Sequence, residues 1–189
     1  MVLGKFRFND DAGFSLIEVV AAIGLLTTAV VTLGQLFAVA TRTNLAARNS
    51  SYTTVLAEQK IEELRALAWG YDSEGLPTSD ITSNTATDAA EGGTGLSPSP
   101  AAALQENTDG FVDYVDQFGR KIGGGTTPPD GAVYTRRWSI SPLPTNPNNT
   151  LIIQVLVTPM QDRGVANEGT VARLPEEARL VTVKTRKAQ

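Results

Sequence analysis

Residues 14–40 form an uninterrupted apolar run in which Glu18 is the only charged residue. The run contains no proline, and as a helix that rises about 1.5 Å per residue it would extend about 40 Å. The hydrocarbon core of a bilayer is about 30 Å thick, so such a helix is long enough to cross it. We therefore predict that residues 14–40 form a membrane-compatible helix.

Three kinds of membrane segment share this composition. A cleaved secretory signal would use Lys5 and Arg7 as its basic region and residues 38–40 as its A-x-A site, but the apolar part of such signals is only about 7–15 residues long. A plain signal anchor explains the length of the run but not the acid within it. A segment whose acid has a defined partner explains both properties.

Glu18 needs such a partner, because an ionised carboxylate inside hydrocarbon costs at least about 2.5–3.5 kcal/mol. One interpretation places Glu18 at the membrane edge, where it reaches water. In the other, the chain is cut between Gly13 and Phe14, which creates an ammonium at Phe14. Glu18 then follows one helical turn later on the same face, where it can pair with its own N-terminus or with that of a neighbouring subunit.

The stretch from Gly13 to Glu18, with the sequence GFSLIE, resembles the prepilin cleavage motif of type IV pilins and pseudopilins. In that family a short hydrophilic leader ends in glycine, the mature chain starts with phenylalanine, and its fifth residue is an acid. The resemblance implies that residues 1–13 are a cytoplasmic leader and that prepilin peptidase cleaves between Gly13 and Phe14 and N-methylates Phe14. It also implies that Glu18 takes part in assembly, through helix contacts with other pilin or pseudopilin subunits.

The helix is predicted to continue through residues 41–70, because residues 41–69 contain neither proline nor glycine and Gly70 is a natural stop. This part is amphipathic, and its apolar stripe is predicted to comprise Leu45, Tyr52, Leu56 and Leu67. The stripe requires a covering layer.

Within this helix, residues 56–65 place Lys60 with Glu63 and Glu62 with Arg65 at the i, i+3 spacing of local ion pairs. The segment resembles the corresponding helix of PilV-type minor pilins and of the minor pseudopilins of type II secretion.

Residues 71–189 are predicted to form a β-rich head with a long acidic loop at about residues 72–110. Alternating or β-branched patterns predict strands at residues 111–118, 133–140, 151–158 and 179–186. Trp69 and Trp138 are expected to pack the helix onto the sheet. A few antiparallel strands on one amphipathic helix make a complete small domain, so the predicted fold class is α+β, with a long N-terminal α-helix packed on a C-terminal antiparallel β-sheet.

Composition and motifs argue against catalysis. The chain has no cysteine, which excludes disulfides and thiolate chemistry, and no histidine, the commonest general base and metal ligand. Its net charge of -4 gives no basic surface for nucleic acid. Gly123 to Gly125 are interpreted as a flexible turn, since no strand-to-helix pattern follows. We therefore expect neither an enzyme nor a cofactor.

A calcium site is the one metal site that the sequence allows. Its oxygen ligands would come from Asp109, Asp113, Asp116 and Asp130. The spacing of these aspartates does not match that of a defined calcium-binding loop.

The resemblance implies a minor pilin-like structural subunit of a type IV pilus. Such a subunit is held in the bacterial inner membrane with its head in the periplasm, and then passes into a filament at the cell surface. An alternative is a minor pseudopilin of a type II secretion or DNA-uptake system. A third, of another class, is a signal-anchored periplasmic binding or adhesion domain, which would keep residues 1–13 and tolerate substitution of Glu18.

Overall fold

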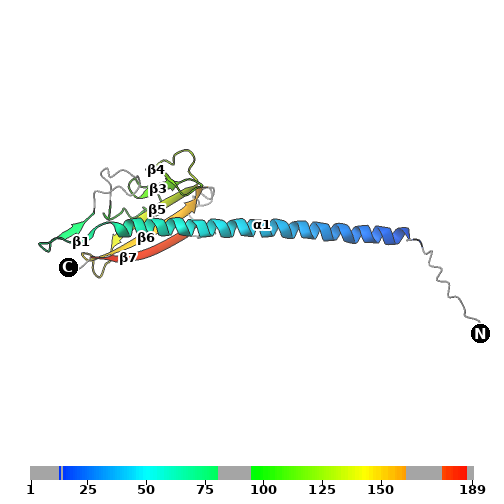
Figure 1. The fold of residues 1–189 in the computed structure, drawn as a ribbon, viewed down its shortest axis with the longest axis horizontal. Coiled ribbons are helices and arrows are strands. Elements are labelled where there is room, and N and C mark those ends of the chain that lie inside the picture. The colour runs from blue at the N-terminus through cyan, green and yellow to red at the C-terminus, as the bar shows by residue number, and fades with distance from the viewer. Residues whose placement is uncertain (1–12, 14, 81–94, 161–175, 187–189) are drawn as a thin grey trace, which may run out of the picture. The chain divides into compact units, whose positions relative to one another are not determined.

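The computed structural model describes residue 13 and residues 15–80, 95–160 and 176–186. Over these residues the chain forms one long helix followed by seven strands, which confirms the predicted α+β fold class (Figure 1). The helix, α1, runs from Leu16 to Ala66. The chain divides after Leu45 into two compact units.

In the first unit, α1 is exposed along its length and mostly apolar. Among the described residues, α1 is the helix that is long and apolar enough to cross a membrane. Thr27, Thr28 and Thr32 donate their hydroxyls to backbone carbonyls one turn earlier, at 2.8 to 3.0 Å. These three hydroxyls are thus satisfied without water, as a lipid environment requires.

The second unit contains a five-stranded antiparallel sheet with the order β4-β3-β5-β6-β7. Its strands are β3 (Val112–Val115), β4 (Lys121–Gly124), β5 (Tyr134–Pro142), β6 (Thr150–Pro159) and β7 (Ala178–Thr185). A separate two-stranded hairpin consists of β1 (Trp69–Tyr71) and β2 (Pro77–Ser79).

The core of this unit lies between the second half of α1 and one face of the sheet (Figure 1). The buried residues of the helix are Thr53, Leu56, Ala57, Lys60, Ile61 and Leu64. Opposite them, β5 and β6 contribute side chains at every second position, including Trp138, Ile140, Ile153 and Val155. Two periodicities, about 3.6 residues in the helix and two in the strands, therefore meet in one apolar layer.

The helical prediction was wrong in two places. Helix α1 ends at Ala66, and Trp69 and Gly70 belong to strand β1. Leu45 is 52% exposed, so the buried stripe starts further along and includes Lys60. Trp138 is fully buried in the core as expected, and Trp69 packs against the core from β1.

All four predicted strands are present, but the sequence missed β4. Two of the three consecutive glycines, Gly123 and Gly124, lie in β4, where Asp113 pairs with Gly124 across the ladder. The interpretation of residues 123–125 as a turn was therefore wrong for these two. The side chain of Pro129 lies within 3.3 Å of where a Cβ of Gly123 would be, so only glycine fits there without a shift.

The predicted acidic loop at about residues 72–110 is only partly a loop. It contains β2, and its residues Leu96 and Ala103 are buried in the core. Residues 81–94 lie outside the described residues. From residue 95 to residue 110 the chain has no helix or strand, as expected of a loop, but it contributes Leu96 and Ala103 to the core.

Lys184 and Arg186 tie distant segments of the second unit together. The Lys184 ammonium donates to the backbone carbonyls of Arg65 and Leu67, which satisfies carbonyls at the end of α1. The Arg186 guanidinium donates to the carbonyls of Gly70 and Thr78 at 3.1 and 2.8 Å, in β1 and β2. It also stacks on the ring of Trp69 at 3.7 Å.

Candidate functional site

The predicted processing site lies just before α1. Gly13 is exposed and outside any helix or strand, and no described residue has an atom within 4 Å of where its Cβ would be. Phe14 lies outside the described residues, so its pairing with Glu18 stays a prediction. Gly13 itself is therefore not packed against any described part of the chain.

Glu18 lies in the first turn of α1, and its side chain is exposed. The backbone N–H groups of Glu18 and Val19 donate to the carbonyl of Ser15 at 3.0 and 3.2 Å, which starts the helix. A carboxylate in the first turn interacts favourably with the positive end of the helix dipole. Glu18 is thus held by local structure at the start of an apolar helix.

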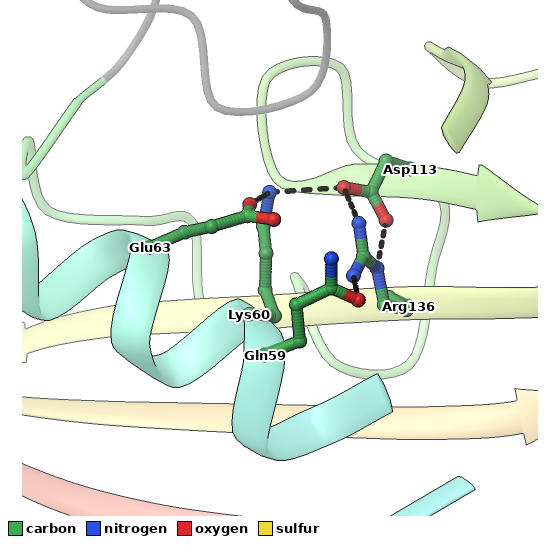
Figure 2. Close-up of polar contacts among 5 residues, drawn as sticks. All are labelled: Gln59, Lys60, Glu63, Asp113 and Arg136. Carbon is green, nitrogen blue, oxygen red and sulfur yellow. Dashed lines mark hydrogen bonds and ion pairs between the residues drawn. The ribbon is translucent and has the colours of Figure 1, made fainter. Parts of the chain in front are cut away.

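A second cluster of charged residues lies inside the head, and we call it the ionic centre. It comprises Lys60 of α1, Asp113 of β3 and Arg136 of β5 (Figure 2). Arg136 donates from Nε to Oδ1 of Asp113 at 2.6 Å and from Nη2 to Oδ2 at 2.9 Å. The Lys60 Nζ donates to Oδ2 of Asp113 at 2.9 Å. Each of the three side chains is at most 1% exposed.

Two further residues of α1 border the ionic centre. Glu63 accepts a hydrogen bond from Lys60 Nζ at 3.0 Å, and its side chain is 34% exposed. Gln59 contacts Arg136 through its Oε1, 3.4 Å from Nη1 (Figure 2). The two cations thus face one buried carboxylate and one that is partly hydrated.

Burial is the strongest influence on Lys60, and it lowers the pKa of the ammonium below the ordinary 10.5. Asp113 and Glu63 oppose this shift, and Arg136 adds to it. The Lys60 Nζ also lies 4.0 Å from the ring centroid of Trp138, which gives a cation–π contact. Because solvent does not reach this centre, its groups are placed to hold the helix and the sheet together.

Sequence reasoning missed the ionic centre, although two signals were present. Lys60 lies on the buried stripe of α1, one turn after Leu56 and one turn before Leu64. Arg136 lies two residues before Trp138 and therefore points to the same inward face of β5. A charge in phase with core residues on two separate elements indicates a buried pair.

Two of the four aspartates proposed for Ca²⁺, Asp113 and Asp116, make separate contacts. Both oxygens of Asp113 accept hydrogen bonds from the two buried cations, Lys60 and Arg136. Asp116 accepts backbone hydrogen bonds from Phe118 and Arg120 at 2.8 and 2.9 Å. Within the described ranges, no three acidic residues come together in a group that could hold a metal ion.

Asp116 offers a test of pH dependence. Burial by itself raises its pKa, but the hydrogen bonds from Arg120 and Phe118 outweigh this and lower the pKa below the ordinary 3.8. A lowered folded-state pKa stabilises the head above the ordinary value, and this contribution is lost as the pH falls through the folded pKa. We expect Asp116→Asn to lower the urea midpoint at pH 6, and this difference should close below about pH 3.8.

The measurement for Asp116 is urea denaturation of the full chain in detergent, followed by tryptophan fluorescence at a series of pH values. The exposed Asp130 provides the matched control, because Asp130→Asn removes the same charge from another loop of the head. A difference between wild type and Asp116→Asn that does not change between pH 6 and pH 3 would contradict the assignment.

The outward face of α1 in the head carries a shallow, largely apolar groove lined by Ala47, Arg48, Ser51, Tyr52 and Val55. Val55 is 57% exposed, whereas its neighbours Leu56 and Ala57 are buried. The head therefore leaves one side of its helix uncovered.

No protein-family model, curated protein or solved structure matches this chain.

Proposed function

We propose that this chain is a minor pilin-like structural subunit that prepilin peptidase processes and that takes part in assembly of a type IV pilus. The observation that carries the proposal is the arrangement at the start of α1. An exposed, non-helical Gly13 precedes an apolar helix long enough to span a membrane, and that helix has one acid in its first turn.

The arrangement supports a two-stage use of α1. In the membrane the apolar side chains of its first unit face lipid, and in the filament the same side chains face other subunits. Lipid and protein interiors are similarly apolar, so the hydrophobic effect does not drive this transfer. An ion pair sets the register between neighbouring helices instead. Glu18 accepts a hydrogen bond from the ammonium of a neighbouring Phe14 in a medium of low dielectric constant.

The decisive test is the intact mass and N-terminal sequence of the protein recovered from its native host. We expect a chain that starts at Phe14 and carries one extra methyl group. A chain that starts at Met1 would instead support the signal-anchored module. A chain that starts at Thr41 would identify a secreted domain, and the role of Glu18 would be lost with it.

A matched pair of glycine variants strengthens this test. Gly13→Leu is expected to leave the uncut precursor in the membrane, because the peptidase must accommodate this residue at the cleaved bond. Gly24→Ala is the control, since Gly24 also has open space around its Cβ position but lies inside α1. Normal cleavage of the Gly13→Leu chain would contradict the proposed processing.

A further inference from the structure

The ionic centre joins three elements that are far apart in the sequence. The contact between Lys60 and Asp113 spans 53 residues, and the one between Asp113 and Arg136 spans 23. Asp113 and Arg136 are direct partners in the β3–β5 ladder, so their ion pair lies within the sheet. Lys60 is therefore the residue that carries the ionic contact from the sheet to the helix.

Stability alone does not explain charges at this place. Desolvation of buried ions consumes much of their mutual attraction, and well-packed apolar residues of similar volume are often as stable or more so. The neighbours of Lys60 on the buried stripe, Leu56 and Leu64, show that apolar side chains suit this layer. What an ion pair adds is direction, because Nζ must come within about 3 Å of an oxygen, whereas apolar surfaces can slide.

The direction that is fixed here is the rotation of α1 about its own axis within the head. Successive residues are about 100° apart around a helix, so a turn by one position would move Lys60 away from Asp113. With Lys60 in place, Ala57 is fully buried and Val55 is 57% exposed. The same rotation therefore decides which side chains form the outward groove of Arg48, Ser51 and Val55.

We propose that Lys60, Asp113 and Arg136 form an alignment lock that holds the head half of α1 in one rotation, and that assembly requires this lock because it determines the helix face presented to neighbouring subunits. The requirement for assembly rests on the proposed function. The existence of the lock concerns the head alone and is tested without filaments.

The test variant is Lys60→Met, which removes the ionic contact between helix and sheet without leaving a buried charge unpaired. Asp113 keeps both hydrogen bonds from Arg136, and Glu63 is partly exposed and can be hydrated. Methionine keeps an unbranched apolar stem in the place of the lysine stem. Leu56→Met is the matched control, because it introduces the same residue one turn earlier on the same buried stripe.

Rotation can be read directly because the chain contains no cysteine. Single cysteines are introduced at Val55, which points outward, and at Ala57, which is buried. The rates of maleimide labelling are then compared in the full chain in detergent. In the wild-type and Leu56→Met backgrounds we expect Val55→Cys to react at least about a hundredfold faster than Ala57→Cys, since the open state that exposes Ala57 is rare.

In the Lys60→Met background this ratio of labelling rates is expected to fall at least about tenfold, while circular dichroism shows an intact helix and sheet. A ratio equal to that of wild type would overturn the lock. If Lys60→Met does not fold, the triple variant Lys60→Met, Asp113→Leu, Arg136→Met removes every charge of the centre and is judged by the same ratio.

The second arm measures the amount of each variant in sheared filaments from the native host. We expect Lys60→Met to be incorporated at least about tenfold less than Leu56→Met, because a head with several helix rotations presents several surfaces. A reduced labelling ratio with normal incorporation would overturn the requirement for assembly. Absence of the wild-type chain from filaments would instead contradict the proposed function, and the labelling arm would still decide whether the lock exists.

Discussion

Replacing Asp113 with asparagine is expected to lower the free energy of unfolding of the head by about 3–5 kcal/mol. Lys60 and Arg136 would then remain buried with no buried anion, because Asp113 accepts hydrogen bonds from both. Glu63 also forms an ion pair with Lys60, but its side chain is 34% exposed. The measurement is urea denaturation of the full chain in detergent, followed by the fluorescence of the buried Trp138.

Asp109→Asn is the control for this variant, because Asp109 is an exposed aspartate four positions before Asp113. It is expected to change the free energy of unfolding by less than about 0.5 kcal/mol. If Asp113→Asn proved as mild as this control, the ionic centre would not be formed as described. Lys60→Met leaves the Asp113–Arg136 pair with balanced charge, whereas Asp113→Asn leaves two buried cations. Comparing the two variants therefore distinguishes the effect of unbalanced buried charge from the effect of lost helix alignment.

Replacing Glu18 with leucine is expected to reduce incorporation into filaments about a hundredfold while the head stays folded. In the proposed filament, the ammonium of a neighbouring Phe14 would lose its partner in an apolar core. An unpaired charge in such a medium costs about 2.5–3.5 kcal/mol, and each 1.4 kcal/mol corresponds to a factor of ten. The measurement is the amount of the variant in sheared filaments relative to the amount in the membrane.

Gln35→Leu is the matched control for Glu18→Leu, because it removes a polar, uncharged and exposed side chain from the same apolar run. It should leave incorporation within about twofold of wild type, since surface changes without a charge are usually small. A Glu18→Leu chain that enters filaments at the wild-type level would remove the register role of this acid.

The fold was predictable where periodicity is strong. Helix α1 follows from an apolar run joined to an amphipathic one, and β5, β6 and β7 follow from alternating or β-branched patterns. Strand β4 was missed because glycine has no side chain to show a period, and its pairing depends on β3. The buried positions of Leu96 and Ala103 were missed because they belong to a segment without a regular period.

The candidate sites differ in the same way. Glu18 could be singled out from the sequence, because one acid in an apolar run is visible in a linear pattern. Lys60 was interpreted as half of a local surface pair, and that pair with Glu63 is present. Its buried ion pair is with Asp113, 53 residues further along the chain, and no local sequence rule predicts that contact. The i, i+3 pair of Glu62 and Arg65 was predicted correctly because both partners lie on one exposed face.

The ties made by Lys184 and Arg186 bear on when the head can mature. Lys184 satisfies carbonyls at the end of α1 from a position 119 residues further along the chain. If the chain crosses the membrane with its first helix leading, the apolar stripe of α1 emerges long before β7 is available. The contacts that Lys184 and Arg186 make near the end of α1 and in β1 and β2 can then form only after the last strand of the sheet has been translocated. On the proposed topology, these last contacts of the head would therefore form only once the whole chain has crossed the membrane.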